Sequence, residues 1–171
     1  NENPSVENLM KKYEKFLSQD LEIGKHLIIK KNDNWECMLN AGFELEACEK
    51  LIGNKALLEV SEISRIGVDT PNFMPFADYV IPVMHNEEPI AFVILGDIEE
   101  EGEGLSPIVR HLRFIQTLSN IIIVAIENIR LYNESLLQVA LKREMELASR
   151  MQAMLIPDHK SLPSNENMRF S

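Results

Sequence analysis

Cysteine and histidine are the side chains that most often bind transition metals or act as nucleophiles and bases, and this chain has few of either. Its 171 residues include two cysteines and four histidines. The separation of Cys37 from Cys48 fits no zinc or redox motif. We expect both to be buried thiols, with a disulfide or a cofactor attachment as the alternative. The scattered histidines are expected to be surface or hydrogen-bonded residues rather than ligands: His26, His85, His111 and His159.

An acidic run, Glu99-Glu100-Glu101-Gly102-Glu103, is the other place where a metal could bind. Such a short run with glycine is typical of a solvated loop, which is the expectation here, with metal binding as the alternative. The sequence shows no serine–histidine–acid, P-loop or dinucleotide motif. We therefore predict no catalytic residue and no metal site in this chain, and that the chain itself is not an enzyme.

Large or soft side chains on two expected strands and one loop are the best candidates for a ligand pocket. Residues 60–76 combine glycine and prolines with several apolar side chains, and such a loop usually folds over a core or a pocket. The candidate ligand-binding residues are Trp35, Cys37, Phe73, Phe76 and Tyr79. Ordinary core packing is the alternative.

Hydrophobic periodicity predicts an α+β domain with a central antiparallel sheet. Helical spacing predicts a first helix over residues 4–21, capped at Asn3, and a short helix over 44–51. Four strands are predicted over residues 26–31, 35–39, 79–84 and 89–96. The last of these is apolar throughout, which is typical of a strand covered on both faces. Pro82 lacks an N–H, so its position should face a gap or an edge of the sheet.

From Ile108 to Ile156 the sequence has neither glycine nor proline, which predicts one helix roughly 70 Å long. A compact domain of about 100 residues has a radius of gyration near 13 Å, so we expect this helix to project and to need a partner. Its apolar residues follow the spacing of a coiled-coil seam, which predicts a parallel homodimer. The seam positions are Ile115, Leu118, Ile122, Ala125, Ile129, Tyr132 and Leu136.

Beyond Leu136 the apolar residues continue in a shifted phase, which locally alters the winding of paired helices. We interpret this stretch as a signalling linker. Its residues are Leu141, Ala148, Met151, Gln152 and Leu155. The alternative is a domain helix followed by a separate short helix.

The net charge of −10 argues against a nucleic-acid backbone or an anionic membrane as partner. Residues 1–107 contain 9 basic and 21 acidic side chains, whereas residues 108–156 contain 6 and 4. No stretch approaches the roughly 18 consecutive apolar residues of a spanning helix, and no secretory leader is visible. We therefore expect a cytoplasmic protein without a nucleic-acid or membrane partner.

Two stretches resemble GAF domains. Pro82-Val83 followed by residues 88–95 resembles their central hairpin, with Ala91 in place of the usual glycine. Residues 124–134, VAIENIRLYNE, resemble the final GAF helix, which commonly reads AIENARLYEE. The resemblance covers about residues 4–135 and implies a GAF-like antiparallel sheet flanked by helices, often with a small ligand between sheet and loops. The cyclic-nucleotide signature and the Cys-His pair of bilin-binding members are absent, so the ligand stays unknown.

Residues 144–157 followed by Leu162-Pro163 are similar to the segment that leads into bacterial serine phosphatases of the RsbU/SpoIIE type. Residues 168–171 would open the first phosphatase strand. The metal-binding aspartates of that family lie further on, one of them in an Asp-Gly pair, and this chain has no Asp-Gly. The resemblance implies manganese or magnesium for the missing phosphatase domain and no cofactor for this chain.

These patterns predict three segments: a GAF-like sensor domain (1–135), a coiled-coil signalling linker helix (136–157) and the start of a truncated phosphatase domain (158–171). The expected function is a regulatory sensor and dimerisation domain that controls a C-terminal metal-dependent protein serine/threonine phosphatase in bacterial signal transduction. The alternatives are a ligand-free dimerising scaffold, or the sensor domain of a nucleotide cyclase or kinase.

Overall fold

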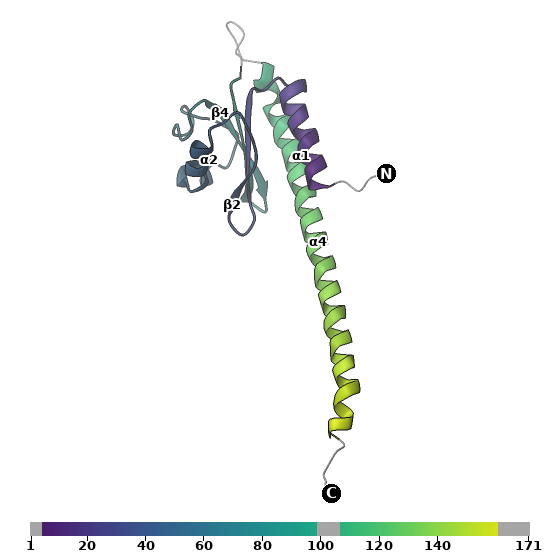
Figure 1. Ribbon diagram of the computed structural model, residues 1–171. Coiled ribbons are helices and arrows are strands. Elements are labelled where there is room, and N and C mark those ends of the chain that lie inside the picture. The colour runs from purple at the N-terminus through teal and green to yellow at the C-terminus, as the bar shows by residue number, and fades with distance from the viewer. Residues whose placement is uncertain (1–4, 99–106, 161–171) are drawn as a thin grey trace. The chain divides into compact units, whose positions relative to one another are not determined.

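The computed structural model describes residues 5–98 and 107–160, so the acidic run at 99–103 and residues 161–171 lie outside the described part. The chain divides into two compact units, Asn1–Glu127 and Asn128–Ser171. The predicted boundary at residue 135 stays a prediction. In the first unit, helices cover both faces of one antiparallel sheet (Figure 1).

The sheet has five strands in the order β2-β1-β5-β4-β3. Their bounds are β1 Lys25–Lys31, β2 Trp35–Ala41, β3 Ser64–Arg65, β4 Ala77–His85 and β5 Glu88–Gly96. The four predicted strands are confirmed, each one or two residues longer at one end or both. The two-residue strand β3 was not predicted, because it is too short to show an alternating pattern. β5 is the middle strand, and its residues 91–95 are all buried, as its apolar sequence predicts.

Strands β4 and β5 form a tight hairpin. Asn86 and Glu87 both have positive φ, 50° and 64°, and His85 pairs with Glu88 across the turn. Two central residues with positive φ suit the right-handed twist of the flanking strands. Strand β3 pairs only with Tyr79 and Val80 of β4. The outer edge of β4 is therefore open at Pro82, as predicted for a residue that lacks an N–H.

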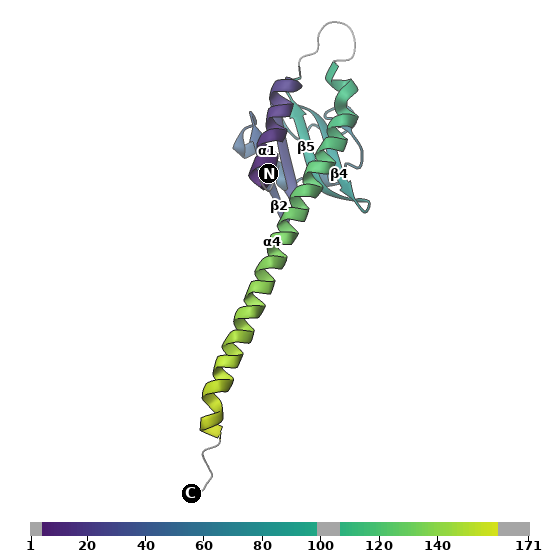
Figure 2. The same ribbon diagram turned by 90° about the vertical axis from the view of Figure 1, so that its right-hand side faces the viewer.

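Two helical segments cover one face of the sheet. Helix α1 (Val6–Lys15) continues into the π-helical turn η1 (Phe16–Asp20), and α1 lies beside the first part of α4 (Pro107–Lys160) (Figures 1 and 2). Ser5 caps α1, its hydroxyl accepting a hydrogen bond from the amide of Asn8 at 3.1 Å; the predicted cap, Asn3, lies outside the described residues. Buried residues of this layer include Met10, Tyr13, Leu17, Ile28, Ile81, Val93, Leu112, Ile115, Ile123 and Ile126.

The opposite face is covered by α2 (Leu45–Ile52), α3 (Lys55–Leu58) and the loop that precedes β4. Helix α2 is predicted almost to its bounds. The four-residue helix α3 was not predicted; the Asn54 side chain caps it by accepting from the amide of Ala56 at 2.9 Å. Buried residues of this layer include Leu27, Ile29, Phe43, Leu51, Leu57, Met74, Val80, Phe92 and Ile94. The alternating residues of β1 and β5 therefore fill two separate cores.

Helix α4 confirms the predicted long helix and extends past Pro157 to Lys160. Judged by length and apolar composition alone, it is the one helix in the described ranges that could cross a membrane. Within the first unit, Leu112, Ile115, Ile123 and Ile126 of this helix are buried in the core on the sheet.

Gly96 ends β5 beneath the backbone of the loop before β4, which makes it a test of the packing there. A Cβ at Gly96 would overlap the Phe76 carbonyl oxygen and lie 3.0 Å from Cζ of Phe43. We expect Gly96→Ala to lower the free energy of unfolding by about 1–3 kcal/mol, because the loop backbone must shift. Gly53→Ala is the matched control, since a Cβ there meets nothing within 4 Å. Equal thermal unfolding of the two variants by circular dichroism would contradict this packing.

Candidate functional site

A pocket of about 150 Å³ lies on the α2 side of the sheet, beside the start of β1. It is lined by Lys25, Gly42, Phe43, Glu44, Ala47, Pro75 and Phe76. Gly42 has φ of 90°, and a Cβ there would lie 2.9 Å from Cγ of Lys25. Glycine at this position therefore lets the aliphatic stem of Lys25 pass close to the backbone between β2 and α2.

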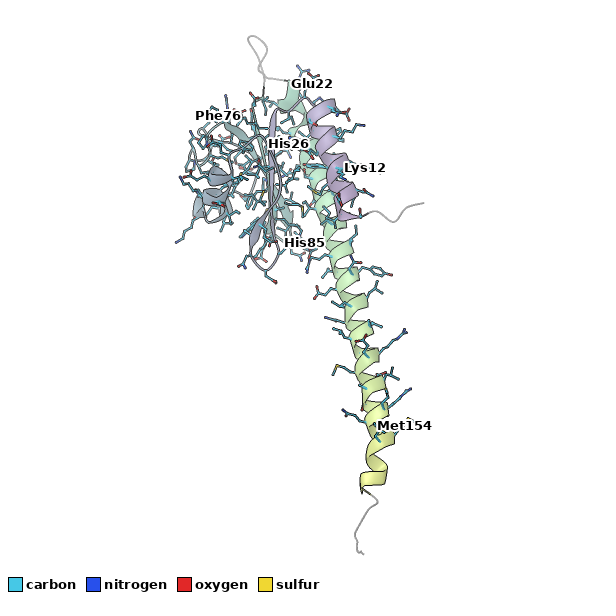
Figure 3. All side chains as sticks on the ribbon, viewed as in Figure 1. Lys12, Glu22, His26, Phe76, His85 and Met154 are labelled. Atoms are coloured by element: carbon cyan, nitrogen blue, oxygen red, sulfur yellow. The ribbon has the colours of Figure 1, made fainter. Side chains whose placement is uncertain are left out.

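The Lys25 ammonium lies over two aromatic rings of this pocket. Its Nζ is 4.4 Å from the ring centroid of Phe76 and 5.9 Å from that of Phe43. Phe43 is buried, whereas the Phe76 side chain is 77% exposed and lies on the α2 side of the sheet (Figure 3). Phe76 has φ of 66°, a conformation that costs a non-glycine residue about 1–3 kcal/mol and that is enriched at functional sites.

The structure does not bring the five predicted ligand-binding residues together. Trp35 packs on Phe92 in the α2-side core, with ring centroids 5.3 Å apart, and Phe73 joins the same core. Tyr79 packs in the core on the opposite face of the sheet. The single pocket predicted for all five is therefore wrong, because residues of β2 and β4, which are separated by β1 and β5 in the sheet, were assigned to one face without a known register.

The predictions for the cysteines and histidines also need correction. Cys48 is buried, but Cys37 is exposed on β2, and its Sγ donates to the Leu39 carbonyl at 3.6 Å. His26 is 1% exposed, and neither ring nitrogen has a hydrogen-bond partner among the described residues. Burial lowers the pKa of His26, and the Glu14 carboxylate raises it by a smaller amount. The neutral imidazole is therefore favoured. The described residues contain no group of three or more side chains placed to hold a metal ion.

Of the predicted ligand residues, only Phe76 lines the pocket; the sequence analysis missed Lys25, Phe43 and Glu44. Lys25 begins a strand of alternating type, and nothing in its sequence neighbourhood marks it as different from Lys31. The pocket volume lies well below the 300–1,000 Å³ of ordinary ligand sites. It is comparable with cavities of about 150 Å³ that take a benzene molecule. A nucleotide would not fit without an opening of the loop.

A partly buried ion pair joins the sheet to α4. Lys30 is 2% exposed, and its Nζ lies 2.6 Å from Oε2 of Glu127 on α4. The same ammonium donates to Oδ1 of Asn32 at 2.8 Å and to the Lys31 carbonyl at 3.3 Å. All three ammonium protons therefore have acceptors, which a buried lysine requires.

Two further polar contacts hold α4 on this face. The hydroxyls of Tyr13 on α1 and Ser119 on α4 form a buried hydrogen bond, and Ser119 donates in turn to the Ile115 carbonyl at 2.5 Å. Burial raises the pKa of Tyr13 to about 12, partly offset by the Ser119 hydrogen bond. Gln116 donates from Nε2 to the Pro82 carbonyl of β4 at 3.1 Å. These contacts fix the rotation of α4 about its own axis.

The predicted dimer seam is divided by this packing. Ile115 is fully buried in the core of its own unit, so its assignment to a seam with a second chain is wrong. Leu118 and Ile122 are half-buried against the same core. In the second unit, Ile129 is half-buried, and Tyr132 and Leu136 are 65% and 50% exposed. The predicted linker residues are all exposed: Leu141, Ala148, Met151, Gln152 and Leu155.

The fold is similar to solved GAF domains. The GAF domain/HD domain protein from Geobacter sulfurreducens aligns with a TM-score of 0.55 at 8% identity, over 77% of this chain and 99% of that one. The GAF domain of a protein described as a sensor histidine kinase, from Pseudomonas syringae pv. tomato, aligns at 0.48 and 12% identity, over 80% and 83%. Residues 122–287 of a methyl-accepting chemotaxis protein align with a TM-score of 0.48 at 10% identity, over 72% of this chain and 90% of that one.

No family model and no curated protein matches this sequence. The first alignment shows the fold: the chain has a GAF-like α+β architecture, with a five-stranded antiparallel sheet, helices on its faces and a long C-terminal helix. At this level of identity the likeness carries no function by itself.

Substitution of the two partners of the Lys30–Glu127 pair should change stability by different amounts. Glu127→Gln leaves a buried ammonium without its counter-charge, so we expect it to lower the free energy of unfolding by about 1–3 kcal/mol. Lys30→Met replaces the buried charge by an apolar chain of similar length and should cost less. Glu134→Gln, which breaks the exposed Arg130–Glu134 pair of 3.1 Å, is the control and should change stability by less than about 1 kcal/mol. Urea denaturation measures all three, and a larger loss for Lys30→Met than for Glu127→Gln would refute the prediction.

Proposed function

We propose that this chain is a regulatory sensor and dimerisation domain that acts on a C-terminal output domain through α4. The observation that supports this is the character of α4 along its length. Up to Ile126 the helix carries buried residues of the core on the sheet. In residues 131–155 of the same helix every large apolar side chain is exposed. An apolar helix surface of this extent is stabilised by burial against a partner.

The partner we propose is a second copy of the chain, in a parallel arrangement. After the correction at Ile115, the proposed seam comprises Leu118, Ile122, Ala125, Ile129, Tyr132 and Leu136. A parallel pair places both copies of the following segment at the same end, where the output domains would meet. The phase shift between Leu136 and Leu141 is the proposed place where a change at the sheet alters the winding of the pair.

The output we propose is a metal-dependent protein serine/threonine phosphatase in a bacterial signalling system, with cytoplasmic location. Its support is the similarity of residues 144–157 and Leu162-Pro163 to the segment that leads into such enzymes. Manganese or magnesium would belong to that following domain. A ligand-free scaffold is the second candidate, favoured by the close packing of Trp35 on Phe92 where an open pocket was predicted.

Dimerisation is tested at Ile129. Ile129→Glu places a charge in the proposed seam, where an unpaired buried charge costs several kcal/mol. We expect light scattering to give a dimer for the native chain at tens of micromolar and a monomer for the variant, with an unchanged circular dichroism spectrum of the folded state. Asn128→Glu is the matched control: it adds the same charge at the adjacent exposed residue outside the seam and should stay dimeric. A monomeric native chain would remove this mechanism.

The direction of the two helices is tested by cross-linking. With Cys37 and Cys48 replaced by serine and alanine, Leu136→Cys should form an intermolecular disulfide on mild oxidation. In a parallel seam, equivalent core residues of the two chains face each other. A dimer that forms without this cross-link would contradict the parallel arrangement.

The output domain is tested in the protein extended beyond Ser171. We expect the extended protein to hydrolyse a phosphoserine peptide with manganese, and the 171-residue chain to show no turnover under the same conditions. Ile129→Glu in the extended protein should change the rate, because the proposed control passes through the helix pair. Absence of carboxylates suited to metal binding from the following sequence would exclude the phosphatase.

A further inference from the structure

The Lys25 ammonium is the feature of the pocket that calls for a ligand. Among the described residues, its contacts are the Phe76 and Phe43 rings, and it forms no ion pair with a carboxylate. Cation–π contacts hold an ammonium in place without neutralising its charge. A positioned and unneutralised cation at the mouth of a pocket favours an anionic ligand.

The walls of the pocket define the rest of the ligand. Phe43, Ala47, Pro75 and Phe76 present apolar groups, and the volume of about 150 Å³ suits one compact apolar group of roughly benzene size. Glu44 is the one carboxylate among the lining residues. Its charge opposes a second negative charge on the ligand, so a monoanion is favoured over a dianion such as a phosphate monoester.

We propose that this pocket binds a small organic monocarboxylate, with its carboxylate on the Lys25 ammonium and its apolar group between Phe43 and Phe76. This inference rests on the proposed sensor function, of which it names the ligand class. Phe76 fits the role, because its backbone is in the left-handed conformation and its exposed ring lies 4.4 Å from the Lys25 ammonium.

Strand β1 connects this pocket to the signalling helix. Lys25 begins the strand on the α2 side, and Lys30, five residues later and therefore on the opposite face, holds Glu127 of α4. A carboxylate that draws Lys25 away from the two rings acts on the same strand that anchors α4. Strand β1 is therefore the element through which occupancy of the pocket would act on Glu127.

The test uses the 171-residue chain with three probes of similar size: benzoate, the dianion phthalate, and neutral benzyl alcohol. Titration followed by amide chemical shifts should show benzoate binding, with shifts at Lys25, Phe43 and Phe76, about tenfold or more tighter than either of the others. Lys25→Met should weaken benzoate by about tenfold or more and leave benzyl alcohol unchanged. Lys31→Met is the matched control, an exposed lysine on the same strand, and should bind benzoate as the native chain does.

Phe76→Asn removes the ring while keeping a residue that tolerates the left-handed conformation, and it should weaken benzoate and benzyl alcohol alike. The proposal is overturned if benzoate and benzyl alcohol bind equally, if Lys25→Met retains full benzoate affinity, or if none of the probes binds. If the chain dimerises through Ile129 but binds none of the probes, the proposed ligand class is wrong and the proposed sensor function is unaffected. If a monomeric chain binds benzoate, the proposed ligand class stands and the proposed dimeric sensor mechanism is wrong.

Discussion

Strand β5 is apolar on both of its faces, and the sheet is therefore stable only when a layer of structure covers each side. Removing one layer would expose alternate residues of three strands to water, at roughly 25 cal/mol for each square ångström of apolar surface. Helix α2, α3 and the loop before β4 supply one cover, and α1 with the first part of α4 supplies the other. Helix α4 is thus required for the sheet before it serves any other purpose.

Apolar burial alone would let α4 rotate or slide on the sheet, because aliphatic side chains pack acceptably in several arrangements. The polar contacts remove that freedom. Lys30 must meet Glu127 and Ser119 must meet Tyr13, since each would otherwise leave a buried group without a partner. A helix held in one rotation presents one defined surface to its surroundings. A helix that transmits a signal needs such a fixed rotation, and a purely apolar interface would not provide it.

Sequence periodicity predicted the elements well, because alternation and helical spacing depend only on neighbours along the chain. It predicted that β5 is covered on both faces and that Pro82 faces a gap or an edge of the sheet. It failed where partners come from distant residues. Ile115 and Ile129 belong to the same apolar spacing, yet Ile115 is buried against its own sheet. Spacing shows that a residue needs an apolar neighbour but not which chain supplies it.

The pocket was beyond sequence reasoning for a similar reason. The positive φ of Phe76 is imposed by the tertiary position of its loop, and aromatic residues give no local sign of it. Alternation along β1 puts Lys25 and Lys30 on opposite faces, but it does not show that one lies over aromatic rings and that the other is buried in an ion pair. The side of the sheet that each residue faces follows from the register, including the irregularity between Ile28 and Ile29. Among the predicted ligand-binding residues, only Phe76 lines this pocket.

The contact between Tyr13 and Ser119 also bears on how the protein is made. The two residues are 106 positions apart, and α1 has no other helix beside it on that face of the sheet among the described residues. A ribosome adds roughly 5–20 residues per second, so α1 leaves it several seconds before Ser119 is synthesised. During that interval Met10, Tyr13 and Leu17 have only an incomplete sheet to contact. The apolar face of α1 consequently stays uncovered until the segment that completes its core emerges.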